Sequence, residues 1–152
     1  MRILLVSLCL LIVGCGKPQL PDESVPELKA YGDMFQGELS IDTYGIKYEW
    51  AVLDSTVLAM CQTWTSGDKL IQVDLSKWLH ATLKGRVQVM YHELGHCAMG
   101  LGHDDTTVTE PLFSKVIYGS MMNTYAFGES WFYSKYEAKY KEALRTKTVI
   151  NF

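Results

Sequence analysis

The chain has few prolines, few cysteines, no excess of basic residues and no hydrophobic run of membrane-spanning length. Of its 152 residues, 4 are proline and 4 are cysteine, and the formal net charge at pH 7 is −3. The absence of a basic stretch argues against a nucleic-acid partner and against membrane binding by charge alone. The apolar run at residues 3–13 is too short to form a permanent transmembrane helix.

The first 26 residues have the composition of a targeting segment followed by a tether. Residues 1–14 combine a positively charged start with an apolar run, as in a signal peptide. Residues 12–15 read Ile-Val-Gly-Cys, which resembles a bacterial lipobox and implies cleavage before Cys15 and lipid on its thiol. An ordinary signal peptide with an incidental cysteine is the alternative. Residues 15–26 contain three of the four prolines and are expected to form a lipidated tether.

A lipidated cysteine would hold the chain on a membrane surface without spanning the bilayer. We therefore expect a lipid anchor in a bacterial cell envelope. Gly16 stands where an inner-membrane lipoprotein is expected to have aspartate, which favours the outer membrane if the source is Gram-negative.

Residues 27–152 are expected to form one domain of the α+β class, because helix-type and strand-type patterns both occur in them. Apolar residues recur at helical spacing in three segments, 27–36, 86–99 and 130–145. Gly37 is expected to end the first of them. Three further segments are rich in β-branched and aromatic residues and predict strands, namely 44–53, 56–65 and 69–75. A turn at residues 66–68 predicts that the last two strands form a hairpin.

The second predicted helix contains the pattern His-Glu-Leu-Gly-His at residues 92–96. Its two histidines lie one helical turn apart on one face, so both imidazoles can bind one metal ion with Glu93 beside it. Gly100 and Gly102 favour a turn after the helix, and His103 is the next side chain able to bind zinc. This clustering of three of the four histidines predicts one Zn²⁺ site. A surface helix with incidental histidines is the alternative.

Together with Ser-Met-Met at residues 120–122, this pattern resembles the metzincin clan of zinc endopeptidases, in which His-Glu-x-x-His-x-x-Gly-x-x-His precedes a Met-turn. More narrowly, it is similar to small bacterial lipoprotein metallopeptidases with His-Glu-Leu-Gly-His-Cys followed by His-Asp. The resemblance implies a minimal catalytic domain with a small mixed sheet packed on a long active-site helix, plus a C-terminal helix. One position departs from the clan, since His103 lies seven residues after His96 instead of six.

The resemblance assigns roles to individual residues. His92, His96 and His103 would bind zinc, and Glu93 would act as the general base. The extra residue in the turn leaves Asp104 as an alternative third ligand. Weaker candidates for a carboxylate ligand are Glu110 and Glu129.

Five further residues around the site have expected roles. By resemblance, Met122 would form an apolar floor beneath the histidines, with Met121 as the alternative register. Tyr125 would either stabilise the reaction intermediate or only pack. In an oxidising compartment Cys61 and Cys97 could form a disulfide between a strand and the active-site helix, and two buried free thiols are the alternative.

The function expected from these residues is a membrane-tethered, zinc-dependent endopeptidase that acts on peptides or proteins. The resemblance implies that the strand at 69–75 offers its edge to an extended peptide and that residues 104–118 line the specificity pocket. A catalytically weak zinc-binding lipoprotein that captures peptides or protein partners is the alternative, and a lipoprotein with a purely structural zinc is a third. Glu93 favours the enzyme, because a structural site more often closes its fourth position with Cys or His. The sequence does not indicate an oligomeric state.

Overall fold

The computed structural model describes residues 24–124 and 131–152, and within them the predicted α+β class is confirmed. The helices are α1 (Pro26–Leu39), α2 (Leu75–His80), α3 (Leu83–Met99) and α4 (Trp131–Thr146). The strands are β1 (Ile46–Ala51), β2 (Ala59–Thr63), β3 (Lys69–Asp74), β4 (Thr107–Glu110) and β5 (Lys115–Tyr118). The expected signal peptide, Cys15, Tyr125 and Glu129 lie outside the described residues. No helix of the described ranges is both long and apolar enough to cross a bilayer.

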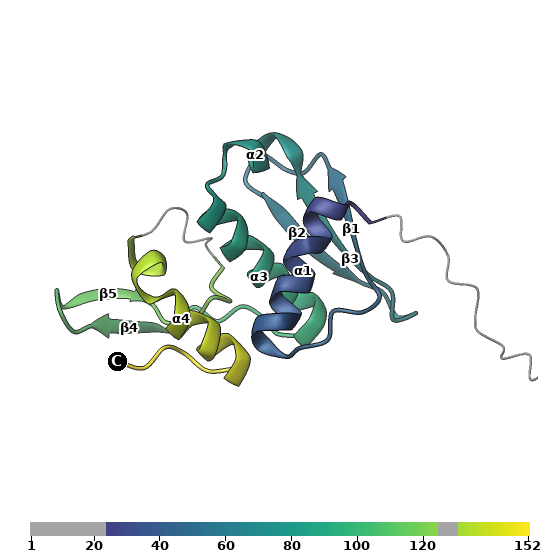
Figure 1. Ribbon diagram of the computed structural model, residues 1–152. Helices are drawn as coiled ribbons and strands as arrows, with labels where there is room; N and C mark the ends of the chain where they lie inside the picture. Colours follow the sequence, from purple (N-terminus) through teal and green to yellow (C-terminus); the bar gives the residue numbers. More distant parts are fainter. Residues whose placement is uncertain (1–23, 125–130) are drawn as a thin grey trace, which may run out of the picture.

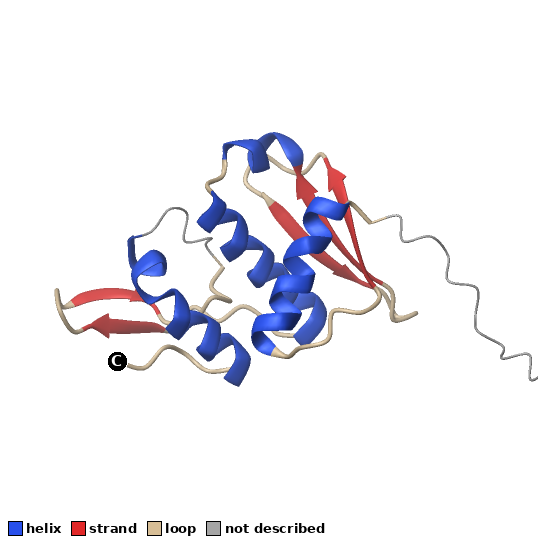
Figure 2. Cartoon of the chain, viewed as in Figure 1, coloured by secondary structure: helices blue, strands red, loops and turns tan. Residues whose placement is uncertain are grey.

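The larger sheet has the strand order β1-β3-β2, and α1 and α3 cover one of its faces (Figures 1 and 2). β2 and β3 pair antiparallel, which agrees with the predicted hairpin, and β1 pairs parallel with β3, so the sheet is mixed. The expectation that the strand at 69–75 forms the edge beside the active-site helix is wrong. Ile71 and Val73 of β3 are fully buried, and this apolar strand takes the central position. The edge strand next to α3 is β2.

The helix α3 is positioned by its apolar face and by an N-cap at Thr82, the residue before its first turn. Met90, Tyr91 and Leu94 are fully buried against the sheet and α1, and the Tyr91 ring meets Phe35 of α1 edge-on at 5.0 Å. The helix begins three residues earlier than its apolar pattern predicted, because the Thr82 hydroxyl accepts the Gly85 N–H and satisfies a free donor of the first turn.

Both ends of α1 differ from the sequence expectation. The helix continues beyond Gly37 to Leu39, where Ser40 adopts a left-handed conformation and ends it. Before the helix, the Val25 N–H donates to the Tyr48 carbonyl at 2.8 Å, and Ser24 is buried. The folded part therefore includes residues 24–26, which the composition had placed in the tether.

The C-terminal part consists of the β4–β5 hairpin and α4 (Figure 1). Residues 107–110 are mostly polar, and they pair with residues 115–118 as an antiparallel hairpin. Tyr140 of α4 is fully buried, and its hydroxyl donates to the Tyr118 carbonyl at 2.6 Å. The Ile150 N–H donates to the Gly119 carbonyl at 2.7 Å, so the end of the chain packs beside the hairpin.

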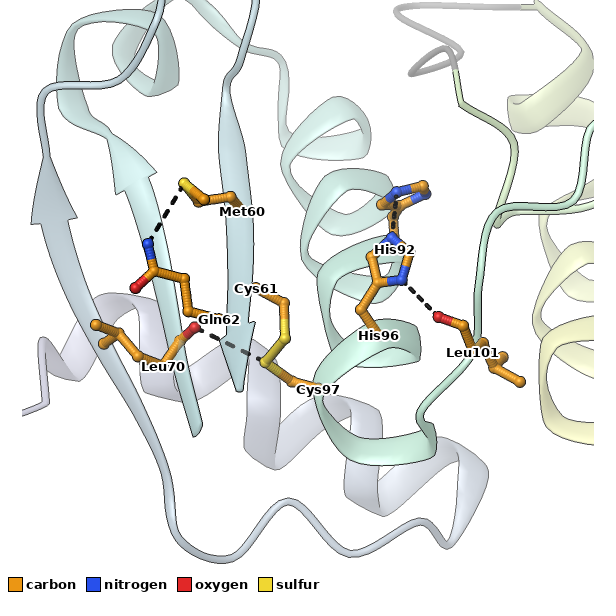
Figure 3. Close-up of a disulfide and its surroundings, with 8 residues drawn as sticks. All are labelled: Met60, Cys61, Gln62, Leu70, His92, His96, Cys97 and Leu101. Carbon is orange, nitrogen blue, oxygen red and sulfur yellow. Dashed lines mark hydrogen bonds between the residues drawn. A yellow bond between two sulfur atoms is a disulfide. The ribbon is translucent and has the colours of Figure 1, made fainter. Parts of the chain in front are cut away.

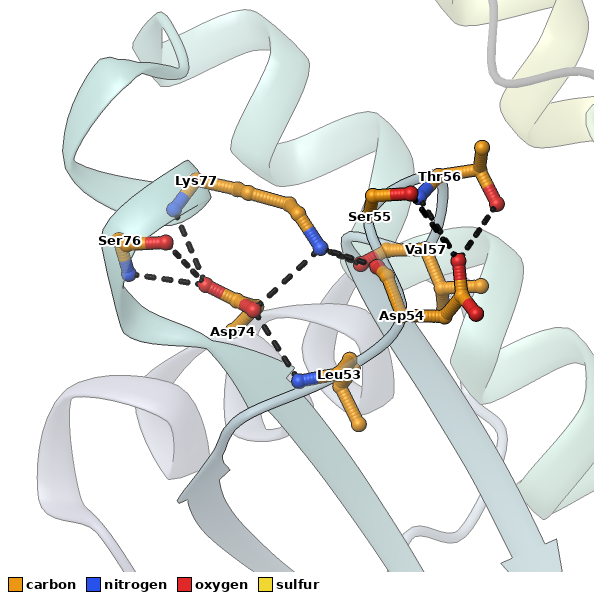
Figure 4. A network of polar contacts seen from close by, with 8 residues as sticks. All are labelled: Leu53, Asp54, Ser55, Thr56, Val57, Asp74, Ser76 and Lys77. Carbon is orange, nitrogen blue, oxygen red and sulfur yellow. Dashed lines mark hydrogen bonds and ion pairs between the residues drawn. The ribbon is translucent and has the colours of Figure 1, made fainter.

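A buried carboxylate joins β3, α2 and the loop between β1 and β2 (Figure 4). Asp74 caps α2 by accepting the backbone N–H groups of Ser76 and Lys77, and it also accepts the Leu53 N–H. The ammonium of Lys77 lies 3.3 Å from the same carboxylate and donates to the Val57 carbonyl. Hydrogen bonds from the Ser76 hydroxyl and the Leu53 N–H, the two largest causes, hold the pKa of Asp74 well below its usual range.

This network predicts a pH-dependent contribution of Asp74 to stability. Because its pKa is lowered in the folded state, the contribution is present above the unfolded pKa of about 3.9 and is lost as the pH falls below that value. We expect Asp74→Asn to lower the midpoint temperature of unfolding at pH 7 by several degrees. The difference from the unmutated protein should shrink as the pH is lowered from 4 toward 2, as measured by circular dichroism.

Asp33→Asn is the matched control. Asp33 forms an exposed ion pair with Lys29, and such pairs contribute little to stability. A difference between Asp74→Asn and the unmutated protein that stays constant across this pH range would contradict the assigned role of the ionised carboxylate.

Candidate metal centre

Three histidines converge on one point from α3 and the turn that follows it. Nε2 of His96 lies 3.1 Å from Nε2 of His92 and 3.3 Å from Nε2 of His103. All three ligand atoms lie within 4.8 Å of one another. The predicted cluster therefore exists, and it is a site that could hold a metal ion.

Backbone carbonyls determine which imidazole nitrogen faces this point. Nδ1 of His92 lies 2.8 Å from the Met121 carbonyl oxygen, and Nδ1 of His96 lies 2.6 Å from the Leu101 carbonyl oxygen. A carbonyl can only accept, so in a neutral imidazole each Nδ1 carries the proton and Nε2 presents a bare lone pair. Two lone pairs 3.1 Å apart repel each other unless a cation lies between them. Burial lowers the pKa of His92 to about 4 and also lowers that of His96, which favours the neutral, ligating form.

Two of the three nitrogen separations are those expected between nitrogen ligands of one metal ion such as zinc. With Zn–N bonds of about 2.0–2.1 Å, two nitrogens of a tetrahedral site are about 3.3 Å apart. The two short Nε2 distances in the cluster, 3.1 and 3.3 Å, are close to that value. The hydrogen bonds from Nδ1 to carbonyls are also the usual outer partners of metal-binding histidines. The three imidazoles therefore form a donor set that could hold one metal ion.

The extra residue in the turn is absorbed at Gly100, which adopts φ +66 and ends α3. The Leu101 N–H then donates to the Gly95 carbonyl, and the Leu101 carbonyl accepts from His96. This tight turn brings His103 to the other two histidines. Asp104, the alternative ligand, is not part of the histidine cluster. Its carboxylate accepts the Thr106 N–H, and its own N–H donates to the Met122 carbonyl.

The segment 120–123 forms a buried floor under α3. Met122 is 3% exposed, and a Cβ at Gly95 would lie only 2.3 Å from its sulfur. The side chain of Met122 therefore fills the space left by a glycine that lies between the two helical histidines. Met121, the alternative to Met122 for the floor residue, is also buried. Its contact with the site is through the backbone, because its carbonyl accepts a hydrogen bond from Nδ1 of His92.

Glu93 lies beside the cluster and is almost completely buried, at 6% exposed. Burial raises the pKa of Glu93 to about 7, and a hydrogen bond from the Cys61 backbone N–H acts in the opposite direction. Cys61 belongs to the edge strand β2, so the strand and the carboxylate are in direct contact.

A disulfide joins the edge strand to the helix. Cys61 and Cys97 are bonded, with their Cα atoms 5.7 Å apart, and Figure 3 shows Cys97 on the side of α3 turned toward β2, away from His92 and His96. A pocket of about 460 Å³ lies between β2 and the histidines. It is lined by Ala59, Met60, Cys61, Thr63, His92, Glu93, His96, Gly100, Leu101 and His103.

Glu110 does not belong to the centre. It is fully buried, and it accepts the Phe113 N–H, the Lys135 ammonium and the Tyr136 hydroxyl. These hydrogen bonds hold the pKa of Glu110 at about 2 against the opposing effect of burial, which is the largest single cause. Its role is to tie the β4–β5 turn to α4.

Two supporting residues were missed in the sequence. The Asp105 carboxylate accepts both the backbone N–H and the hydroxyl of Thr124, which ties the His103 loop to the end of the floor segment. Gly95 could have been recognised, because a glycine in the middle of a helix is costly and often marks a close approach.

Neither a protein-family model nor a curated protein nor a solved structure matches this chain. The resemblance to the metzincin clan therefore rests on the motif residues themselves. The common element of the sequence pattern and the structure is the three-histidine cluster.

The contact between Gly95 and Met122 generates a prediction about metal affinity. Gly95→Ala would place a methyl group against the Met122 sulfur and shift the segment whose Met121 carbonyl orients His92. We expect zinc affinity to fall about 10-fold or more, as for the loss of other outer partners of zinc ligands. Competition with a chelating dye measures this change.

Gly37→Ala is the control, because a Cβ at that helical glycine meets nothing within 4 Å. Combining Gly95→Ala with Met122→Ala should recover part of the lost affinity by opening space for the methyl group. Unchanged zinc affinity in Gly95→Ala would show that the floor segment does not position His92.

Proposed function

We propose that this protein is a zinc-dependent endopeptidase. The observation that carries the proposal is the convergence of three Nε2 atoms beside a buried glutamate, in a pocket bounded by an edge strand. A purely structural zinc site would more often have a fourth protein ligand. Cys97 is next to His96 in sequence, but it is occupied by its disulfide.

His92, His96 and His103 would hold the ion. When bound, zinc supplies an open coordination position at which the pKa of a water falls toward neutrality and a substrate carbonyl is polarised. The three imidazoles add no charge, so they leave the full +2 charge of the ion to act on these ligands.

Glu93 would act as the general base. Its carboxylate takes a proton from the attacking water and returns it to the nitrogen of the leaving amine. Because the carboxylate is almost fully buried, few waters compete for this proton. The Cys61 N–H fixes the carboxylate against β2 while it accepts and returns the proton.

The edge strand β2 would bind the substrate. In a β-strand the N–H and C=O of one residue point to the same side. The Cys61 N–H faces Glu93, so the Cys61 carbonyl also faces the pocket and can accept a substrate N–H. An extended peptide paired with this edge would pass in front of the histidines. This assigns to β2 the role that the sequence had assigned to β3.

We also propose that lipid on Cys15 attaches the enzyme to a membrane of the bacterial cell envelope. The support is the lipobox-like sequence at residues 12–15. The substrates of the anchored enzyme would then be peptides or proteins that reach this membrane surface.

The enzyme proposal predicts a specific effect of Glu93→Gln. A soluble form lacking residues 1–21 keeps every described residue and is suited to the measurement. Zinc content should stay at one ion per chain, because the ligands are unchanged. Cleavage of a mixed peptide library should fall on the order of 10²- to 10⁴-fold, the usual contribution of a general base.

Glu49→Gln, at an exposed position of β1, is the control and should cleave as the unmutated protein does. His92→Ala should lose zinc as well as activity. If the unmutated protein binds zinc but cleaves nothing, the enzyme proposal is wrong and a zinc-binding lipoprotein without turnover takes its place.

A further inference from the structure

The β4–β5 hairpin, which follows the turn after α3, exposes large apolar side chains. Leu112 and Val116 are each 69% exposed, and Phe113 is 58% exposed. Figure 1 shows the hairpin projecting beside α4, with the C-terminus next to β4. Exposed large apolar residues that gather at one place usually mark a contact surface.

The hairpin tip is held in a defined position. The Glu110 carboxylate accepts the Phe113 N–H at 2.8 Å within the turn, and it also binds Lys135 and Tyr136 of α4. Because Glu110 is fully buried, these contacts fix the turn against the helix. The exposed side chains are therefore presented on a supported turn.

Lysines and aromatic rings alternate from the tip along α4 to the C-terminus. The Lys135 ammonium lies 5.2 Å from the centre of the Phe113 ring and 4.9 Å from that of Tyr136. The Tyr136 ring packs edge-on against Phe152, and Lys139 lies 5.2 Å from the Phe152 ring. We call this surface the hairpin strip. It consists of Leu112, Phe113, Val116, Lys135, Tyr136, Lys139 and Phe152.

The charge of the two parts of the molecule differs in sign. Residues 24–106 contain six Lys and Arg and eleven Asp and Glu, a side-chain charge of −5. Residues 107–124 and 131–152 contain six Lys and Arg and three Asp and Glu, a charge of +3. Glu110 is buried, and Glu137 and Glu142 pair with Lys141 and Arg145. The apolar tip thus belongs to the positively charged part.

We propose that the hairpin strip binds the surface of an anionic phospholipid bilayer. Leu112, Phe113 and Val116 enter the boundary between headgroups and acyl chains, where apolar side chains gain by leaving water. Lys139 remains at the headgroup level, because lysine can extend along apolar surface while its ammonium meets lipid phosphate. Lys135 and Tyr136 hold the tip through Glu110. This contact is independent of the metal centre.

Tryptophan quenching tests the proposal in the full chain. Phe113→Trp is mixed with vesicles of phosphatidylcholine and phosphatidylglycerol that carry brominated acyl chains, and the signal of the native tryptophans is subtracted. We expect roughly twofold quenching of the added tryptophan, because bromine quenches only on contact within the acyl region. Val52→Trp, at a position that is 98% exposed in the negatively charged part, should not be quenched.

Charge is tested in the same assay. Lys115 is exposed at the start of β5, next to Val116 of the strip. Lys115→Ser combined with Lys139→Ser should reduce the quenching of Trp at 113, and so should high salt, whereas Lys84→Ser on α3 should not. Leu112→Trp places the added tryptophan at the same tip. It replaces Phe113→Trp in the assay if circular dichroism shows that Phe113→Trp does not fold.

Three results would overturn the proposal. The first is equal quenching at positions 113 and 52 with anionic vesicles. The second is equal quenching at position 113 with vesicles of phosphatidylcholine alone. The third is a blue shift at position 113 that appears without vesicles and grows with protein concentration, since a second copy of the chain would then cover the tip.

Discussion

Two hydrogen bonds from imidazole N–H groups to backbone carbonyls decide what the metal centre can bind. They fix the tautomers of His92 and His96, so the Nε2 lone pairs of both side chains face one point. Each carbonyl comes from a different segment, Leu101 from the turn after α3 and Met121 from the floor segment. The centre therefore depends on the turn and the floor being folded, and both are positioned by Gly95. Its carbonyl accepts the Leu101 N–H, and its missing side chain admits Met122.

The opposite side of α3 is held by a covalent bond. The disulfide between Cys61 and Cys97 closes a loop of 36 residues, for which chain-entropy arguments give about 4 kcal/mol of stabilisation. Its place matters as much as its energy, because Cys61 and Glu93 line the same pocket. Cys97 holds the edge strand from one face of the helix while His96, its neighbour, faces the other two histidines. One turn of α3 thus sets the distance between the edge strand, the carboxylate and the histidines.

Local patterns in the sequence predicted the elements of this centre, and their spatial partners were harder to predict. The spacing of His92 and His96 on one helix face follows from helical geometry, as does the turning away of Cys97. Whether His103 or Asp104 reaches the two helical histidines depends on the backbone conformation of Gly100. The number of residues in the turn does not determine that conformation. The order of the strands depends on the parallel pairing of β1 with β3, two strands that are far apart in the chain. Because local patterns do not show this pairing, the edge strand was misassigned. The hairpin at 107–118 was missed because its first strand is short and mostly polar.

The net charge of the whole chain averages two parts of opposite sign. The value of −3 for the whole chain gives no indication that residues beyond 106 carry a positive surface with exposed apolar side chains. The partition follows the chain, since residues 24–106 carry a side-chain charge of −5 and the described residues after them, the hairpin, α4 and the C-terminal residues included, carry +3. An anionic surface that attracts the hairpin repels the part that carries the pocket. The electrostatics alone would therefore turn the pocket away from such a surface, toward substrates in the surrounding solution.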